Sequence, residues 1–328
     1  MTPGPAGQTI RPATPDDLAA CAAIWRDSLN DYLGRLAQPE IPDDLGPILR
    51  LYGHLRVTDP ATFLVAESTA RDGTRPDAID GFAVGLRRDD LWFLSMLFVR
   101  PAVQGRGLGR ALLAAAAPDP ETWTGHRATA TDSLQPISNG LYASLGMVPR
   151  VPLLRLVGLP ERPEAFAPLP AGIEAIGFDE VGDGPAAANA ADGLGRAALA
   201  AELAALDLDA AGFSRAVDHA FHVTEGRVGF LYRDRDGHAV GYGYTSESGR
   251  VGPIAVRDGA LLGPVVGHLV RAVRPRGAFG MWVPGTAGEA IVPLLRGGFR
   301  IDGYPVLLCW DRPFADLARY VPMSPGLL

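Results

Sequence analysis

The feature that most constrains this sequence is a run of alternating glycines between an apolar segment and a helix-forming segment. The apolar segment Leu91–Val99 predicts a buried strand, interrupted only by Ser95, and a proline follows it closely. The next residues read Gln-Gly-Arg-Gly-Leu-Gly over positions 104–109. Residues 110–117 are rich in leucine and alanine and predict a helix. The segment therefore predicts a strand, a glycine loop and a helix N-terminus in direct succession.

This succession favours the binding of an anion. The first N–H groups of a helix have no partner inside the helix, and the helix dipole adds positive potential at the same end. Glycines at positions 105, 107 and 109 carry no side chain that would keep a phosphate away from those N–H groups. A tight turn alone would not require three alternate glycines before a helix. We therefore expect a phosphate group of a ligand to bind at this loop.

Two common phosphate-binding motifs do not fit the loop. A Walker-type loop ends in Gly-Lys-Ser/Thr, but the chain contains no lysine, and all 30 of its basic residues are arginine. The same absence excludes a kinase lysine and a Schiff-base lysine. A dinucleotide-binding loop has the spacing Gly-x-Gly-x-x-Gly and an acidic residue about 20 positions further on. Here the spacing is Gly-x-Gly-x-Gly, and Asp119 and Glu121 lie in a proline-rich stretch.

The loop instead resembles the pyrophosphate-binding loop of the GNAT superfamily of N-acetyltransferases. The family pattern, Gln/Arg-x-x-Gly-x-Gly/Ala, is matched by Gln104, Gly107 and Gly109. In that family the loop holds the pyrophosphate of acetyl-CoA, and the backbone of the preceding strand binds the pantetheine arm. The resemblance implies acetyl-CoA as cosubstrate and no metal. The cosubstrate-binding residues that it implies are Leu97, Phe98, Val99, Gln104, Gly105, Arg106, Gly107, Leu108, Gly109 and Arg110.

A second segment, residues 136–147, resembles a later helix of the same family. The family pattern is Asn-Pro-x-Ser-Asn-x-Leu-Tyr-x-x-x-Gly-Phe, and this chain follows it from Gln135 to Met147. Gln135 stands where asparagine is usual, and Met147 stands where phenylalanine is usual. The resemblance implies that Tyr142 is catalytic and protonates the departing CoA thiolate. It also implies that Gln135 and Asn139 contact the cosubstrate.

The chain predicts two domains joined by a proline-rich linker. Residues 159–172 contain prolines at positions 160, 163, 168 and 170 and little periodicity, which is typical of a domain boundary. We expect an acetyl-CoA-binding N-acetyltransferase domain over residues 1–158 and a second domain over residues 173–328. The order of predicted strands and helices in the second half repeats that of the first, which indicates an internal duplication. The fold class that we expect is α/β (α+β), with two GNAT-like domains, each a mixed, mostly antiparallel central sheet flanked by helices.

The second copy departs from the first at the positions that carry the chemistry. The counterpart of the glycine loop, residues 257–262, reads Arg-Asp-Gly-Ala-Leu-Leu, with Asp258 where phosphates would lie. A carboxylate beside a pyrophosphate is repulsive by about 1 kcal/mol or more near a surface. The helix expected over residues 287–297 has no tyrosine at the leaving-group position, where Leu294 falls. We therefore expect a degenerate GNAT-like domain that binds no CoA.

Composition predicts a globular protein of the cytoplasm. The chain has 47% hydrophobic and 20% charged residues, and its longest clean apolar run is far too short to span a bilayer. A net charge of −7 argues against nucleic-acid binding. Cys21 and Cys309 stand in apolar segments and are expected to be small buried side chains in a reducing compartment. We expect a monomer or homodimer with no nucleic-acid or membrane partner.

The expected reaction is direct transfer of an acetyl group from acetyl-CoA to a primary amine. The amine, on a small molecule or a peptide, attacks the thioester carbon while backbone N–H groups near residues 97–99 polarise the carbonyl. The alternative is a non-catalytic acyl-CoA-binding or interaction protein on the same scaffold, against which the retained Tyr142 argues. The acceptor amine stays open, as does any contribution of the second domain to the substrate pocket.

No general base is assigned. The strand of residues 91–99 carries no carboxylate, and Asp132, near the end of the following strand, fits helix capping better than base catalysis. His54 and His126 lie in the first domain, but their positions in the sequence do not place them near the loop.

A metal site is not expected. His219 and His222 are three residues apart on a predicted helix, a spacing that suits metal ligation. No cysteine or further histidine joins them at ligand spacing. We therefore expect these histidines to lie on a solvated or pocket-edge helix face.

Overall fold

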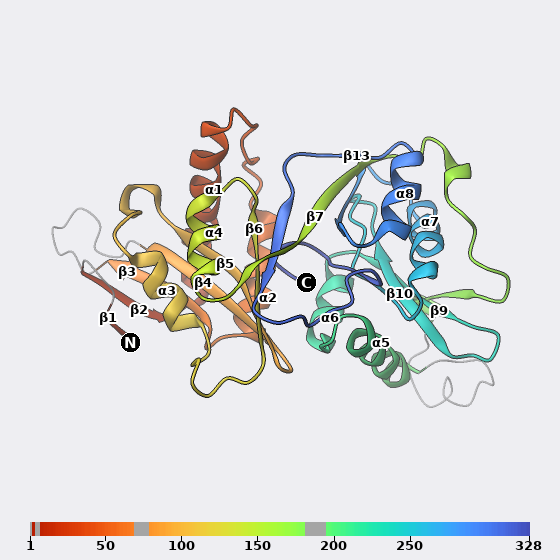
Figure 1. Ribbon diagram of the computed structural model, residues 1–328, viewed down its shortest axis with the longest axis horizontal. Coiled ribbons are helices and arrows are strands. Elements are labelled where there is room, and N and C mark those ends of the chain that lie inside the picture. The colour runs from red at the N-terminus through yellow and green to blue at the C-terminus, as the bar shows by residue number, and fades with distance from the viewer. Residues whose placement is uncertain (1, 4–6, 69–78, 181–194) are drawn as a thin grey trace. The chain divides into compact units, whose positions relative to one another are not determined.

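The structure, a computed structural model, describes residues 2–3, 7–68, 79–180 and 195–328. The chain divides into two compact units, residues 1–129 and 130–328. Figure 1 shows the elements coloured from the N-terminus in red to the C-terminus in blue. The sequence also predicts a polar turn over residues 71–77 and a helical stretch that begins at residue 185, and both the turn and the start of that stretch lie outside the described residues.

The first unit is built on a mostly antiparallel sheet with the strand order β1-β2-β3-β4-β5-β6. Strands β5 and β6 run parallel, with Leu91 opposite His126 and Leu94 opposite Thr129. Beyond Leu94, β5 pairs within this unit with β4 alone, so residues 97–99 have no strand on their other side there. The strands are β1 (Thr2–Pro3), β2 (Gln8–Pro12), β3 (Phe63–Ser68), β4 (Ile79–Arg88), β5 (Leu91–Val99) and β6 (His126–Asp132), of which β6 ends beyond the unit.

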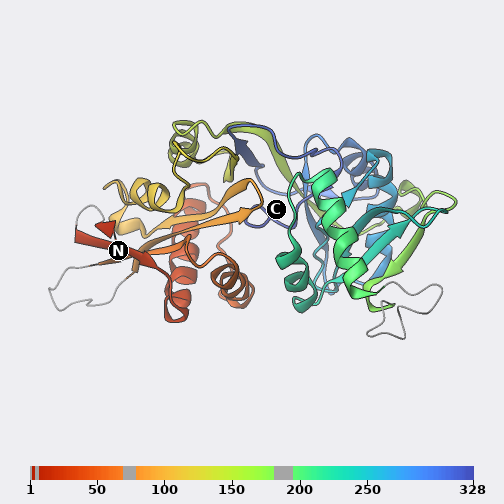
Figure 2. The same ribbon diagram turned by 90° about the horizontal axis from the view of Figure 1, so that it is seen from below.

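Helices cover both faces of this sheet (Figure 2). Alternate residues of β4 face opposite sides, as the pleat of a strand requires. Phe82 packs edge-on against Tyr52 of α2, with ring centroids 5.4 Å apart. Gly81 faces α3 so closely that a Cβ there would lie 3.1 Å from Cδ1 of Leu112. The helices are α1 (Leu18–Arg35), α2 (Gly46–Thr58) and α3 (Leu108–Ala116).

The second unit contains a five-stranded antiparallel sheet with the order β15-β11-β10-β9-β8. Alternate residues of β10 also face helices on opposite sides of the sheet, as in β4. Tyr242 donates a hydrogen bond to Asp207 of α5, and Gly243 faces Leu269 of α7. The strands are β8 (Glu174–Gly177), β9 (Val228–Arg233), β10 (Ala239–Thr245), β11 (Ile254–Val256) and β15 (Tyr320–Val321). The helices are α4 (Pro136–Ala143), α5 (Arg196–Ala210), α6 (Ala216–Thr224), α7 (Leu262–Ala272) and α8 (Gly288–Arg296).

A second group of strands in this unit is centred on β7 (Val148–Gly158). Its first half pairs antiparallel with β14 (Val306–Trp310), and its second half pairs antiparallel with β12 (Phe279–Pro284). The short strand β13 (Arg300–Ile301) also pairs with β7. The strand expected to close the first domain thus forms its hydrogen bonds with strands of the C-terminal sequence. For this reason the compact units divide at residue 129, before the proline-rich segment 159–172.

The proline-rich segment packs against the second unit. Phe166, in its middle, is buried, and its ring centroid lies 6.2 Å from that of Phe299. The N–H of Arg162 donates to the carbonyl of Gly297 at 3.2 Å. The segment is therefore held at the C-terminal end of α8 by an aromatic pair and a backbone hydrogen bond.

The two units confirm the expected fold class, because each has a mostly antiparallel sheet flanked by helices. The element order from β8 to β14 also follows the order from β2 to β7. A continuous apolar core in the second unit joins β7 to the elements around it. Its fully buried members include Leu156, Val265, Val266, Leu269, Phe279, Val283 and Leu294.

We expect Leu156→Ala to lower the free energy of unfolding by about 2–5 kcal/mol, because it leaves a cavity in this core. Urea unfolding followed by circular dichroism measures the change. Leu154→Ala is the matched control, since Leu154 is only half-buried on the same strand and should cost less. Equal losses for the two variants would show that β7 does not contribute its buried face to this core.

Candidate functional site

The glycine loop between β5 and α3 has the backbone that the sequence predicts. Gly105 and Gly107 have φ angles of 77° and 85°, in the left-handed region that favours glycine. A Cβ at either position would meet no described atom within 4 Å. Gly107 is the N-cap of α3, which begins at Leu108. The loop therefore reverses tightly and leaves its backbone uncovered.

The N-terminus of α3 is suited to an anion. None of the described side chains caps it, and its first turn contains no Asp or Glu. Arg106 and Arg110 flank the helix start and are exposed. Unpartnered N–H groups, the helix dipole and two nearby guanidinium groups all favour negative charge at this point.

Side-chain hydrogen bonds tie the end of β5 to the loop. Gln104 donates from Nε2 to the carbonyl of Val99 at 2.8 Å, and Ser28 of α1 donates from Oγ to the same oxygen at 3.1 Å. Leu97, Phe98 and Val99 are half-buried. The side chain of Gln104 is thus engaged within the protein and stabilises the turn into the loop.

Helix α4, in the second unit, carries the other predicted residues. Gln135 is its N-cap and accepts a hydrogen bond at Oε1 from the N–H of Ile137 at 3.3 Å. Asn139 donates from Nδ2 to the carbonyls of Asp132 and Gln135 at 2.9 and 2.8 Å. Its Oδ1 is buried and has no partner among the described residues. An orphaned buried acceptor favours a ligand that brings an N–H donor.

Tyr142, on the same helix, is buried with 5% of its surface exposed. Burial raises the pKa of its phenol above the usual value near 10, and Cys309 of β14 adds to the shift. Burial also raises the pKa of the Cys309 thiol to about 12, so neither group is charged at neutral pH. Met147 is buried, and its N–H donates to the carbonyl of Tyr142 at 3.1 Å.

The predicted cosubstrate residues therefore fall into two groups. Residues 97–99 and 104–110 form one continuous strand, loop and helix start in the first unit. Gln135, Asn139 and Tyr142 lie on or next to α4 in the second unit.

The counterpart of the glycine loop in the second half is closed by its own side chain. Asp258 accepts a hydrogen bond at Oδ1 from the N–H of Ala260 at 2.9 Å and caps the turn that precedes α7. The carboxylate thus takes an N–H group that a phosphate would otherwise bind. On α8, Leu294 is fully buried.

Comparison with protein families gives a match over residues 59–148 to the model described as "Acetyltransferase (GNAT) domain". The matched segment includes the glycine loop and Tyr142. Residues 59–148 are therefore similar to a GNAT acetyltransferase domain. The match ends at the start of β7. The similarity of the C-terminal sequence to known proteins therefore comes from the comparison of structures alone.

Solved structures share the fold of the whole chain. A presumed acetyltransferase from Pyrococcus horikoshii has a TM-score of 0.71 and 14% identity, over 98% of this chain and 96% of that one. A GCN5-related N-acetyltransferase from Sphaerobacter thermophilus has a TM-score of 0.57 and 18% identity, over 96% and 99%. A tandem GNAT protein from the clavulanic acid biosynthesis pathway has a TM-score of 0.53 and 16% identity, over 93% and 99%. A search of curated protein sequences finds no match to this chain.

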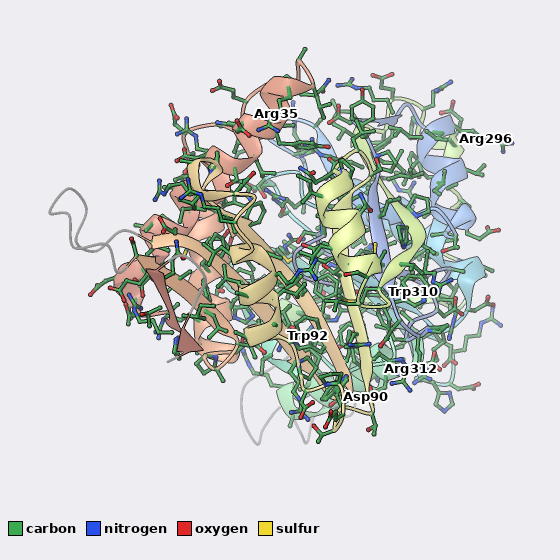
Figure 3. All side chains as sticks on the ribbon, turned by 60° about the vertical axis from the view of Figure 1, so that its left-hand side comes forward. Arg35, Asp90, Trp92, Arg296, Trp310 and Arg312 are labelled. Atoms are coloured by element: carbon green, nitrogen blue, oxygen red, sulfur yellow. The ribbon has the colours of Figure 1, made fainter. Side chains whose placement is uncertain are left out.

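Two of the three candidate bases considered in the sequence have structural partners in the folded chain. His126 starts β6, donates from its N–H to the carbonyl of Asp90 at 2.7 Å, and places Nε2 3.5 Å from Oδ2 of Asp90 (Figure 3). It therefore lies at the end of β5 opposite to the glycine loop. Asp132 accepts the N–H of Leu134 at Oδ1 at 2.8 Å in the turn before α4, but the N-cap of α4 is Gln135, so the helix-capping role expected for Asp132 is wrong. His54 lies half-buried on α2.

A buried polar cluster in the second unit was not expected from the sequence. Asp207 of α5 accepts hydrogen bonds from Arg215 Nε at 3.1 Å and from the hydroxyl of Tyr242. His219 of α6 places Nε2 2.9 Å from Asp207 Oδ2 and Nδ1 2.8 Å from the hydroxyl of Tyr244. The cluster joins residues far apart in sequence, and the spacing of His219 and His222 was its one local signal.

The charges around Asp207 determine the protonation state of its carboxylate. The charge of Arg215 and a hydrogen bond from His219 outweigh the effect of burial and lower the pKa of Asp207. Asp207 is therefore ionised and acts only as an acceptor in this cluster. Both ring nitrogens of His219 are engaged, and both histidines are buried, so the expectation that they lie on a solvated or pocket-edge helix face is wrong.

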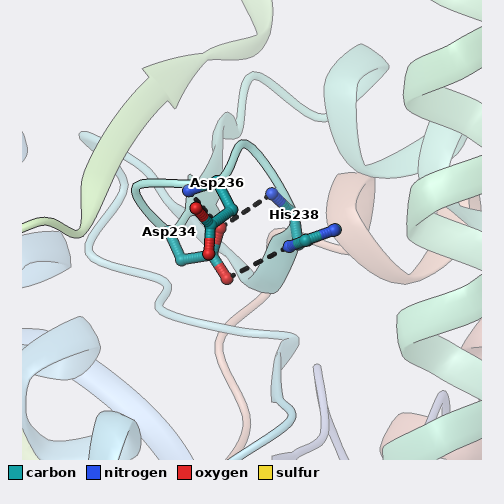
Figure 4. Close-up of side chains that lie close together, drawn as sticks. All are labelled: Asp234, Asp236 and His238. Carbon is teal, nitrogen blue, oxygen red and sulfur yellow. Dashed lines mark hydrogen bonds and ion pairs between the residues drawn. The ribbon is translucent and has the colours of Figure 1, made fainter.

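A second group of possible ligands lies at the β9–β10 turn (Figure 4). Asp234, Asp236 and His238 each offer a donor atom within a small distance of one another. However, Asp234 Oδ1 already accepts the N–H groups of Asp236 and His238 at 3.0 and 2.9 Å. These hydrogen bonds are typical of a tight turn and explain why the three side chains lie close together.

No helix of the described residues is long and apolar enough to cross a membrane.

We expect stability to depend on pH through His222. Burial and the charge of Arg227 hold its pKa well below 6.5, so the folded state keeps it neutral while the unfolded state takes up a proton. The free energy of unfolding should therefore be constant, with respect to this group, above about pH 6.5. Below that pH it should fall by up to about 1.4 kcal/mol per pH unit. Urea unfolding at pH 5, 6 and 7 measures this slope.

His222→Phe should flatten that slope. His238→Phe is the control, because its side chain is 76% exposed and should leave the slope unchanged. A wild-type slope that survives His222→Phe would assign the acid sensitivity to other groups.

Proposed function

We propose that this chain is an acetyl-CoA-dependent N-acetyltransferase whose active copy spans residues 1–158. The observation that carries the proposal is the start of α3. There, two left-handed glycines, an uncapped first turn and the absence of a first-turn carboxylate provide a site for a pyrophosphate. Residues 159–172 serve as the connection to a degenerate second copy over residues 173–328.

Residues outside the loop also fit the cosubstrate. Within the first unit, Leu97 and Phe98 of β5 have β4 as their one strand partner among the described residues, and the carbonyl of Val99 beside them accepts from Gln104 and Ser28. Such an edge suits the amide groups of a pantetheine arm, which can bind in the manner of a strand. The orphaned Oδ1 of Asn139 is a further acceptor that suits an amide N–H.

The proposed chemistry is direct attack of a neutral amine on the thioester carbon. Backbone N–H groups around residues 97–99 polarise the carbonyl as the tetrahedral intermediate forms. The C–S bond then breaks, the nitrogen keeps the acetyl group and releases its proton to solvent water, and the sulfur takes a second proton. We assign that second proton to the phenol of Tyr142, whose raised pKa keeps it protonated at neutral pH. The acceptor is a small-molecule or peptide amine.

We expect Gly107→Glu to abolish binding of acetyl-CoA, because it places a carboxylate against the phosphates. Isothermal titration calorimetry on the folded variant measures the loss. Gly237→Glu is the matched control: Gly237 also has a positive φ, 81°, and open space around it, but it lies at the β9–β10 turn. The control carries the same backbone strain and the same charge change. If both variants bind equally well, the pyrophosphate does not lie at the loop.

We expect Tyr142→Phe to lower turnover by about 10²-fold or more at saturating acetyl-CoA, the usual size of an acid–base contribution. The variant removes one hydroxyl and little volume, so CoA binding should survive. Tyr232→Phe is the control, because it removes a buried hydroxyl that bonds His268 at 3.0 Å and should leave turnover unchanged. A Tyr142→Phe variant with nearly full kcat would remove Tyr142 from the mechanism and favour a binding role for the scaffold.

A further inference from the structure

The chain beyond β14 runs back over the second unit as a strap, which we define as residues 311–328. Trp310 and Arg312 mark its beginning in Figure 3. The strap contains β15, and it is part of the folded core. Its buried apolar members are Leu317, Tyr320, Val321, Leu327 and Leu328.

The strap covers the free edge of β11, the counterpart of β5. Val321 pairs with Ile254 and Tyr320 pairs with Ala255 in antiparallel register. The N–H of Val256 donates to the carbonyl of Arg319 at 3.0 Å. In the first unit the corresponding strand edge is the one that suits a pantetheine arm. In the second unit that edge is already paired with the chain itself.

The strap also covers the helix start that corresponds to the glycine loop. The guanidinium of Arg319 donates to the carbonyl of Arg257 at 2.8 Å, beside the turn that Asp258 caps. A Cβ on Gly259 would lie 3.7 Å from Cγ of Arg319 and from the carbonyl oxygen of Ala318. In the first copy, the strand edge and the helix start are the two parts of the proposed acetyl-CoA site. In the second copy, the strap lies against both corresponding parts.

Charged anchors hold the strap in place. Arg319 donates to Asp209 Oδ2 at 2.7 Å and to Asp316 Oδ2 at 2.7 Å. The fully buried guanidinium of Arg215 lies 4.6 Å from the ring centroid of Tyr320 and donates to the carbonyl of Leu328. Without the strap, the buried guanidinium of Arg215 would lose these contacts. Burial of a charge without partners raises the free energy of the folded state.

We propose that the strap is the permanent internal occupant, in the second copy, of the place where the first copy binds acetyl-CoA. The comparison between copies rests on the proposed function. The strap supplies a strand to the free edge and a cation to the carbonyl at the helix start, so the second copy is complete without a ligand. It therefore excludes acyl-CoA, and the chain carries one CoA site.

Amide hydrogen exchange on the full chain, with and without coenzyme A, tests this proposal. A permanent occupant opens only with its unit, so the amides of β11 and β15 should exchange as slowly as those of β10. Saturating coenzyme A should slow exchange at residues 105–110 and leave residues 254–262 and 319–321 unchanged. Rapid exchange of β15 through local opening would overturn the proposal, as would any slowing at residues 257–262 on addition of coenzyme A.

Arg319→Ala provides the second arm. The loss of several charge-assisted hydrogen bonds should accelerate exchange of β15 and β11 about tenfold or more. Arg276→Ala is the control, because it removes another ion-paired arginine of this unit whose side chain is 82% exposed. Unchanged protection in Arg319→Ala would overturn the anchoring role. If coenzyme A protects no residue, the proposed function fails, whereas the strap is still judged by its protection without ligand.

Discussion

The pairing of β7 is the constraint on which the rest of the second unit depends. One strand of 11 residues has β14 along its first half and β12 along its second half, and Leu156 places its side chain in the apolar core. The strand follows the GNAT domain directly in sequence, yet its partners come from the C-terminal part. Removing β7 from the C-terminal strands would leave the backbone groups of β12, β13 and β14 on that side without their partners, which is unfavourable for buried groups.

The two halves of the chain differ at the helix start by a single carboxylate, that of Asp258. In the first copy the N–H groups before α3 have left-handed glycines around them and no competing side chain. In the second copy Asp258 satisfies one of these groups from within the chain. Whether an external anion finds an unpaired donor at a helix start therefore depends on the side chain that precedes the helix.

Local signals allowed most elements and the glycine loop to be predicted from the sequence. Alternating glycines, an apolar run and a leucine-rich segment each act over a few residues, so β5, the loop and α3 lie where expected. The strap and the pairing of β7 were not predicted, because the partners of Val321 and Leu156 lie tens to more than a hundred positions away. Asp207 was missed for the same reason: a carboxylate in an alanine-rich helix has no local mark of burial.

The two copies also differ on the faces of β4 and β10 that meet the helix pairs. In the first copy, Phe82 meets Tyr52 in an apolar contact. In the second, Tyr242 meets Asp207 and the contact is polar. Burying an ionised carboxylate is unfavourable unless it is paired, and Arg215 supplies the charge that Asp207 needs. Arg215 in turn contacts the strap at Tyr320 and Leu328, so the polar core and the strap require each other. One buried arginine thus joins the polar core of the second unit to the C-terminal strap.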